Sequence, residues 1–187
     1  MSELFNREAV LSLLHEHTQS VALRRHAYAV EAAMRAAAAR EGGDPAYWGA
    51  AGLLHDFDYE LYPEAPAHAN RGAEILRARG YPEEFVRVVL SHASYTGVPR
   101  ESACARWLFA VDELCGFCMA CAMVQPDRKI AAVQVSSVLK KLKKKDFAAK
   151  VNREEIAEGA AVLELTREDL IEHVLGALRG VAGELDL

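Results

Sequence analysis

Apolar residues recur at helical spacing along almost the whole chain of 187 residues. Side chains three and four positions apart share one face of a helix, whereas strict alternation marks a strand. No stretch of this sequence alternates convincingly, and no internal repeat is visible. The pattern therefore predicts an all-α protein.

Capping residues and helix breakers divide this pattern into about nine helices. Asn6, Ser20 and Asp44 are typical N-cap residues, and Gly42-Gly43 is a typical helix end. Predicted helices span about 7–17, 21–41, 45–55, 67–79, 82–92 and 101–124, with one or two more in 128–147 and two that follow caps at Asn152 and Thr166. The segments 57–66 and 94–100 are predicted loops.

The spacing of these elements indicates a single domain over residues 1–187. We expect a compact multi-helix bundle with a core at about 20–125 and a helical C-terminal extension at about 128–187. Short connections favour this arrangement, because no linker is long enough to split the chain. Oligomeric state is not encoded in any pattern that we can identify.

Charge and apolar run length restrict the partners and the compartment. The net charge of −5 argues against nucleic-acid binding, which normally needs a basic surface. No apolar run is long enough for a membrane span, and the N-terminus does not resemble a signal peptide. Cys104, Cys115, Cys118 and Cys121 lie within one apolar stretch, where small thiols pack well in a core. These features together predict a cytoplasmic protein.

His55 and Asp56 stand where an apolar helix, AAGLLHD, gives way to a loop. Neighbouring helical residues point about 100° apart, so a metal ion over the helix end is an object that both can reach. Imidazole nitrogen with carboxylate oxygen suits Zn, Mn or Fe. The alternative is that His55 is only a charge against the helix dipole.

Four further residues have unusual placements. His26 lies beside an apolar stripe, His92 ends the apolar helix FVRVVLSH, and Asp112 interrupts WLFAVDELCGF. A buried carboxylate is costly unless it is paired or binds a metal. The alternatives are a core histidine at 26 and a buried salt bridge at 112. His68 begins the helix after the loop and could equally be solvated.

The order H…HD…H…H…D resembles that of the HD superfamily of metal-dependent phosphohydrolases, which are all-α proteins. The likeness covers about residues 20–125, through RRHAYAVE, GLLHDFDYE, HANRGAEILRARGYPEEFVRVVLSHASYTG and LFAVDEL. It is similar to the branch that includes bacterial dinucleoside tetraphosphate hydrolases. The resemblance implies a metal site within a helical bundle.

By the matching positions, the resemblance implies one or two divalent ions. One ion would be held by His26, His55, Asp56 and Asp112. A second would be held by His68 and His92, with Asp56 as the bridge. If only one ion binds, His68 and His92 would instead bind phosphate or donate protons. The sequence does not distinguish Fe, Mn, Zn, Ni, Co and Mg.

The activity implied by the resemblance is hydrolysis of a phosphoric ester or anhydride in a small phosphorylated molecule, such as a nucleotide. Metal-bound hydroxide would attack phosphorus. One departure matters, because Tyr59 stands where some members carry a charged residue. Asp58 is therefore our candidate for proton transfer, with Asp56. A non-catalytic ligand-binding or regulatory module and a di-iron oxygenase on the same scaffold are the alternative functions.

Cationic groups are expected near a phosphate site. Arg25, Arg71 and Arg100 lie close in sequence to the candidate ligands, and Arg71 is favoured because it shares a helix face with His68. The lysine run 140–145 is either a solvated helix end or a positively charged surface that attracts an anionic substrate.

Overall fold

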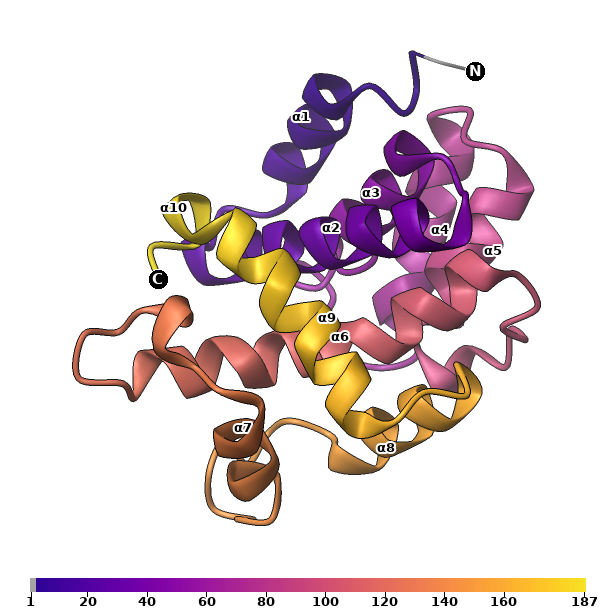
Figure 1. Cartoon of the computed structure of the whole chain (residues 1–187). Helices are drawn as coiled ribbons and strands as arrows, with labels where there is room; N and C mark the ends of the chain where they lie inside the picture. Colours follow the sequence, from indigo (N-terminus) through magenta and orange to yellow (C-terminus); the bar gives the residue numbers. More distant parts are fainter. Residues whose placement is uncertain (1–2) are drawn as a thin grey trace.

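The structure is a computed structural model that describes residues 3–187, so Met1 and Ser2 of the predicted domain lie outside it. It confirms the all-α prediction (Figure 1), and residues 3–187 contain no strand. The α-helices are α1 Arg7–His17, α2 Val21–Glu41, α3 Pro45–Leu54, α4 Ala67–Ala78, α5 Glu83–Ser91, α6 Ala103–Met123, α7 Val135–Leu142, α8 Arg153–Val162, α9 Arg167–Gly180 and α10 Ala182–Leu185. Two 3-10 turns occupy Ser94–Thr96 and Ile130–Ala132.

Most predicted helix boundaries are confirmed, because the predicted caps form. The Asn6 side chain accepts hydrogen bonds from the amides of Glu8 and Ala9. Ser20 caps α2 in the same way, and Asp44 caps α3. These bonds satisfy amides that have no partner within the helix, and they hold the first turn of each helix in place.

Helices α2, α3 and α6 form the centre of the molecule. The alanine-rich α2 packs along α3 and also contacts α6, and α9 crosses both α2 and α6 (Figure 1). Most apolar side chains of α6 are buried, including all four cysteines of the chain. Helix α8 packs against α6, so part of the predicted C-terminal extension lies beside the predicted core.

Two local features differ from the predictions. The start of α4 is not regular helix, because His68 has an extended ψ of 149° and Ala69 has a left-handed φ of 59°. The predicted loop at 94–100 contains a 3-10 turn, and α10 is a short helix that the apolar pattern did not reveal. None of the helices within residues 3–187 is long and apolar enough to cross a membrane.

Candidate metal centre

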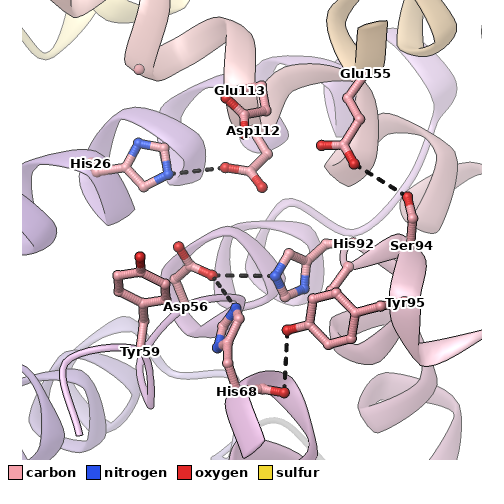
Figure 2. Close-up of a pocket in the computed structure, with 12 residues that line it drawn as sticks. His26, Asp56, Tyr59, His68, His92, Ser94, Tyr95, Asp112, Glu113 and Glu155 are labelled. Carbon is pink, nitrogen blue, oxygen red and sulfur yellow. Dashed lines mark hydrogen bonds and ion pairs between the residues drawn. The ribbon is translucent and has the colours of Figure 1, made fainter. Parts of the chain in front are cut away.

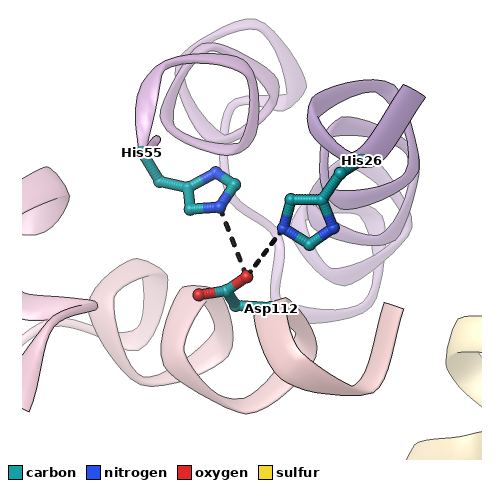
Figure 3. A group of neighbouring side chains, drawn as sticks. All are labelled: His26, His55 and Asp112. Carbon is teal, nitrogen blue, oxygen red and sulfur yellow. Dashed lines mark hydrogen bonds and ion pairs between the residues drawn. The ribbon is translucent and has the colours of Figure 1, made fainter. Parts of the chain in front are cut away.

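Six side chains from five parts of the chain lie close together (Figures 2 and 3). They come from the second turn of α2, the ends of α3 and α5, the irregular start of α4, and α6. They are His26, His55, Asp56, His68, His92 and Asp112. The structure therefore brings together every residue that the sequence suggested as a metal ligand.

One group of three consists of His26, His55 and Asp112 (Figure 3). Oδ1 of Asp112 lies 3.0 Å from Nε2 of His26 and 3.3 Å from Nε2 of His55. Each residue offers one ligand atom, and these atoms all lie within 4.8 Å of one another. That spacing allows all three to reach one ion.

The second group consists of Asp56, His68 and His92. Oδ1 of Asp56 lies 3.0 Å from Nε2 of His68 and 3.2 Å from Nε2 of His92. The other carboxylate oxygen of Asp56 lies 3.6 Å from Nε2 of His55. Asp56 therefore faces both groups, as a bridging ligand would.

Three of the imidazoles have their orientation set by a hydrogen bond on the far side of the ring. Nδ1 of His55 donates to the Gly52 carbonyl at 2.8 Å. Nδ1 of His92 donates to the Val89 carbonyl, and Nδ1 of His68 to the Asp58 carboxylate. Such bonds fix the tautomer that leaves Nε2 as the free ligand atom.

The surroundings of the His55 ring indicate whether these residues fit a metal ion. His55 is completely buried, yet its Nε2 has no hydrogen-bond partner within the described chain. Its neighbours are carboxylate oxygens of Asp112 and Asp56, at 3.3 Å and 3.6 Å, which form ion pairs with it. A buried polar atom without a hydrogen bond costs free energy, and a metal ion held by these donors would satisfy it. The surrounding imidazole and carboxylate donors suit Zn, Mn, Fe and similar ions.

Electrostatics within the two groups also suit a cation. Burial opposes protonation of His55, but Asp56 and Asp112 outweigh it and raise the pKa of His55 to about 10. Asp56 and Asp58 likewise outweigh burial and raise the pKa of His68 to about 9. Burial opposes ionisation of Asp56 and Asp112, but the imidazoles hold both carboxyl pKa values well below their usual range. A divalent ion would replace the imidazole protons in this role.

Asp58 lies behind His68 and does not line the cavity. It is completely buried, and its two oxygens accept hydrogen bonds from Nδ1 of His68 at 3.0 Å and from the Gly72 amide at 2.8 Å. The role in proton transfer that we predicted for Asp58 stays a prediction. Its geometry suits a residue that orients His68.

The cavity beside these ligands has a volume of about 300 Å³. Tyr59 lines it, with its ring 5.1 Å from that of His68. Tyr95 also lines it and donates a hydrogen bond to the His68 carbonyl at 3.3 Å (Figure 2). The position where a charged residue was expected therefore provides an aromatic wall.

None of the three predicted phosphate-binding arginines lines the cavity, because each has other partners. Arg25 pairs with Asp186 at 2.9 Å, and Arg71 pairs with Glu74 at 2.7 Å on the exposed surface. The Arg100 guanidinium lies 3.4 Å from the centre of the Phe109 ring. The lysines of the run 140–145 do not line the cavity either.

Sequence reasoning missed two acidic residues of the cavity, Glu113 and Glu155. Burial and the Asp112 charge raise the pKa of Glu113 to about 7, and they raise that of Glu155 as well. Glu113 follows Asp112 directly, so its position in the same apolar helix was an available signal. Glu155 lies in α8, far along the chain from the other cavity residues, and no sequence pattern indicated it.

Comparison with known proteins gives one match. A family model described as the HD domain matches residues 23–115, a range that includes all six candidate ligands. The match does not reach α8, so Glu155 lies outside it. No curated protein and no solved structure matches the chain significantly.

Proposed function

Since the chain belongs to the HD-domain superfamily through residues 23–115, we propose that it is a metal-dependent phosphohydrolase that acts on a small phosphorylated molecule. The observation that carries this proposal is the convergence of four imidazoles and two carboxylates, of which all but the buried His55 line one cavity. A structural salt-bridge network would account for the carboxylates. In such a network Nε2 of the buried His55 makes no hydrogen bond and has only ion-pair contacts with Asp112 at 3.3 Å and Asp56 at 3.6 Å, whereas a metal ion would bind this atom directly.

The proposed reaction is hydrolysis of a phosphate ester. A water oxygen attacks phosphorus, the bond from phosphorus to the leaving oxygen breaks, and the leaving oxygen takes up a proton. Bound divalent ions would supply charge neutralisation and a lower pKa for water. His26, His55 and Asp112 would hold one ion, and His68 with His92 would hold the other, with Asp56 between them.

The remaining residues of the cavity would position the substrate and admit water. The side chain of Asp56 is 25% exposed and that of His26 is 20% exposed, so solvent reaches the ligand atoms. Asp58 would keep the His68 ring in place through the bond to Nδ1. Tyr59 and Tyr95 would enclose the organic part of the substrate.

Metal loading followed by a substrate panel tests this function. The full chain is freed of metal, loaded in turn with Mn, Fe, Co, Ni, Zn and Mg, and analysed for bound metal. It is then assayed against phosphomonoesters, nucleotides and dinucleoside polyphosphates. We expect turnover by at least one loaded form, and a loss of at least about 100-fold in Asp56→Asn, because this change removes a charge that faces both groups.

Asp146→Asn is the matched control, because Asp146 is an exposed carboxylate away from the cavity. It should retain wild-type activity. A protein that takes up no metal after reconstitution would contradict the proposal. Tight metal binding without turnover across the panel would favour a regulatory module, and oxygen uptake by the iron-loaded form would favour an oxygenase.

A further inference from the structure

One wall of the cavity is acidic. Glu113 of α6 and Glu155 of α8 line the same cavity as the metal ligands Asp56 and Asp112 (Figure 2). No lysine or arginine of residues 3–187 lines it. A site built only to hold phosphate groups would be expected to contain such cations.

The fold holds Glu155 in this position. Helix α8 approaches α6 so closely that a Cβ added at Gly159 would lie 2.6 Å from the Cα of Ala110. Glu155 is one helical turn before Gly159, and its carboxylate accepts a hydrogen bond from Ser94 at 3.4 Å. The same Ser94 hydroxyl accepts a hydrogen bond from Arg100 at 2.8 Å, so the charge of Arg100 also acts on Glu155. Arg100 makes no hydrogen bond to Glu155, and the carboxylate keeps most of its acceptor capacity for a ligand.

Charge balance then restricts the substrate. The cavity contains four carboxylates, those of Asp56, Asp112, Glu113 and Glu155. Bound divalent ions would offset the charges of their ligands Asp56 and Asp112, and Glu155 adds a further acidic group to the same cavity. A phosphomonoester adds close to two negative charges near pH 7, and each further phosphate adds more. A positive group on the substrate itself would offset this negative charge beside Glu155.

We propose that the cavity accepts a phosphomonoester whose organic part carries an ammonium group, with the ammonium N–H groups donating to Glu155 and Glu113 and the phosphate facing the metal centre. This inference rests on the proposed phosphohydrolase function. The rings of Tyr59 and Tyr95 line the same cavity and offer faces that attract cations. Glu155 of α8 would thus contribute to substrate choice from outside the HD-domain match.

Binding calorimetry with matched ligands tests this inference independently of catalysis. The metal-loaded full chain is titrated with aminoalkyl phosphates of two, three and four carbons, and with n-alkyl phosphates of the same lengths. A charge-assisted hydrogen bond within a protein supports roughly tenfold or greater discrimination. We therefore expect at least about tenfold tighter binding of the amino ligand at one or more of these lengths.

Two substitutions in α8 test whether Glu155 causes the preference for the amino ligand. Glu155→Gln should reduce the preference for the amino ligand to less than about threefold, because the amide retains the shape but removes the charge. Glu154→Gln is the matched control, since Glu154 is an exposed neighbour that does not line the cavity. It should retain the wild-type preference. A preference that persists unchanged in Glu155→Gln would overturn the inference.

Titration with orthophosphate separates this inference from the proposed function. If both ligand series bind and are hydrolysed equally, the ammonium inference is wrong and the phosphohydrolase proposal stands. If the amino series binds preferentially but no ligand is hydrolysed, the ligand class stands and the proposed catalysis is wrong. If neither orthophosphate nor any alkyl phosphate binds the metal-loaded protein, both are wrong.

Discussion

The Asp58 carboxylate accepts a hydrogen bond from Nδ1 of His68 at 3.0 Å, and Nε2 of the same ring lies 3.0 Å from Asp56. The second oxygen of Asp58 accepts the Gly72 amide at 2.8 Å. Both oxygens of a fully buried carboxylate are thus occupied by donors. The irregular backbone at His68 and Ala69 places the ring between Asp56 and Asp58.

Replacing Asp58 with asparagine should weaken the metal group of Asp56, His68 and His92. An asparagine amide has one acceptor oxygen, so its NH₂ group must face either the His68 donor or the Gly72 donor. We expect metal affinity at this group to fall about 10- to 100-fold, as is typical for the loss of a ligand-orienting partner. Chelator competition measures the affinity. Equal affinities in wild type and Asp58→Asn would show that Asp58 does not orient the ring.

Gly72→Ala tests, through packing, how closely the chain surrounds the Asp58 carboxylate that supports His68. An added Cβ would lie 3.0 Å from Cγ of Asp58 and 3.1 Å from Cε1 of Phe57, and both residues are buried. We expect a loss of about 1–3 kcal/mol in the free energy of unfolding of the metal-free protein, measured with urea. Gly176→Ala in α9 is the control, because an added Cβ there meets nothing within 4 Å. That variant should gain about 0.5–1 kcal/mol.

Local sequence signals were sufficient for most of the fold. Asn6, Ser20 and Asp44 act on amides two or three residues away, so their effect can be predicted without knowledge of tertiary structure. The irregular start of α4 could not be predicted in this way. There His68 contacts Asp58, and only the folded chain brings these residues together.

Some candidate ligands are unusual in their local context, and the resemblance to the HD superfamily combined them with His68 into one set. Asp112 stands out as a carboxylate in an apolar helix, and His55-Asp56 stands out at a helix end. Arginine contacts are different, because a long flexible side chain on the surface pairs with whichever carboxylate is near. Arg71 shares a helix face with His68, yet it pairs with Glu74. Glu155 reaches the cavity only because α8 packs on α6.

The thermal stability of the metal-free protein should depend on pH through this cluster. His55 and His68 have pKa values raised from 6.5 to about 10 and about 9, so their stabilising effect is complete below pH 6.5 and is lost as pH rises through those values. Asp56 and Asp112 have lowered pKa values, so their stabilising effect is present above 3.8 and is lost as pH falls below it. We expect the cluster to contribute most between about pH 4 and pH 6.5.

Melting curves in EDTA from pH 4 to pH 10 measure this dependence. The Tm of the metal-free wild type should fall between pH 6.5 and pH 10. The metal-loaded protein is the comparison, because its imidazoles are ligated and carry no extra proton to lose. A Tm of the metal-free protein that rises over this alkaline range would contradict the charge assignment.

His92→Ala should separate the two metal groups. Nε2 of His92 lies beside the Asp56 oxygen that also faces His68, whereas the other Asp56 oxygen faces His55. We therefore expect metal content after dialysis to fall from two equivalents per chain to one, with the remaining ion held by His26, His55 and Asp112. His15→Ala is the control, because His15 lies outside both groups and bonds to the Tyr28 hydroxyl at 2.7 Å. A wild-type content of one equivalent that His92→Ala leaves unchanged would show that the second group holds no metal, and would leave His68 and His92 free to bind phosphate directly.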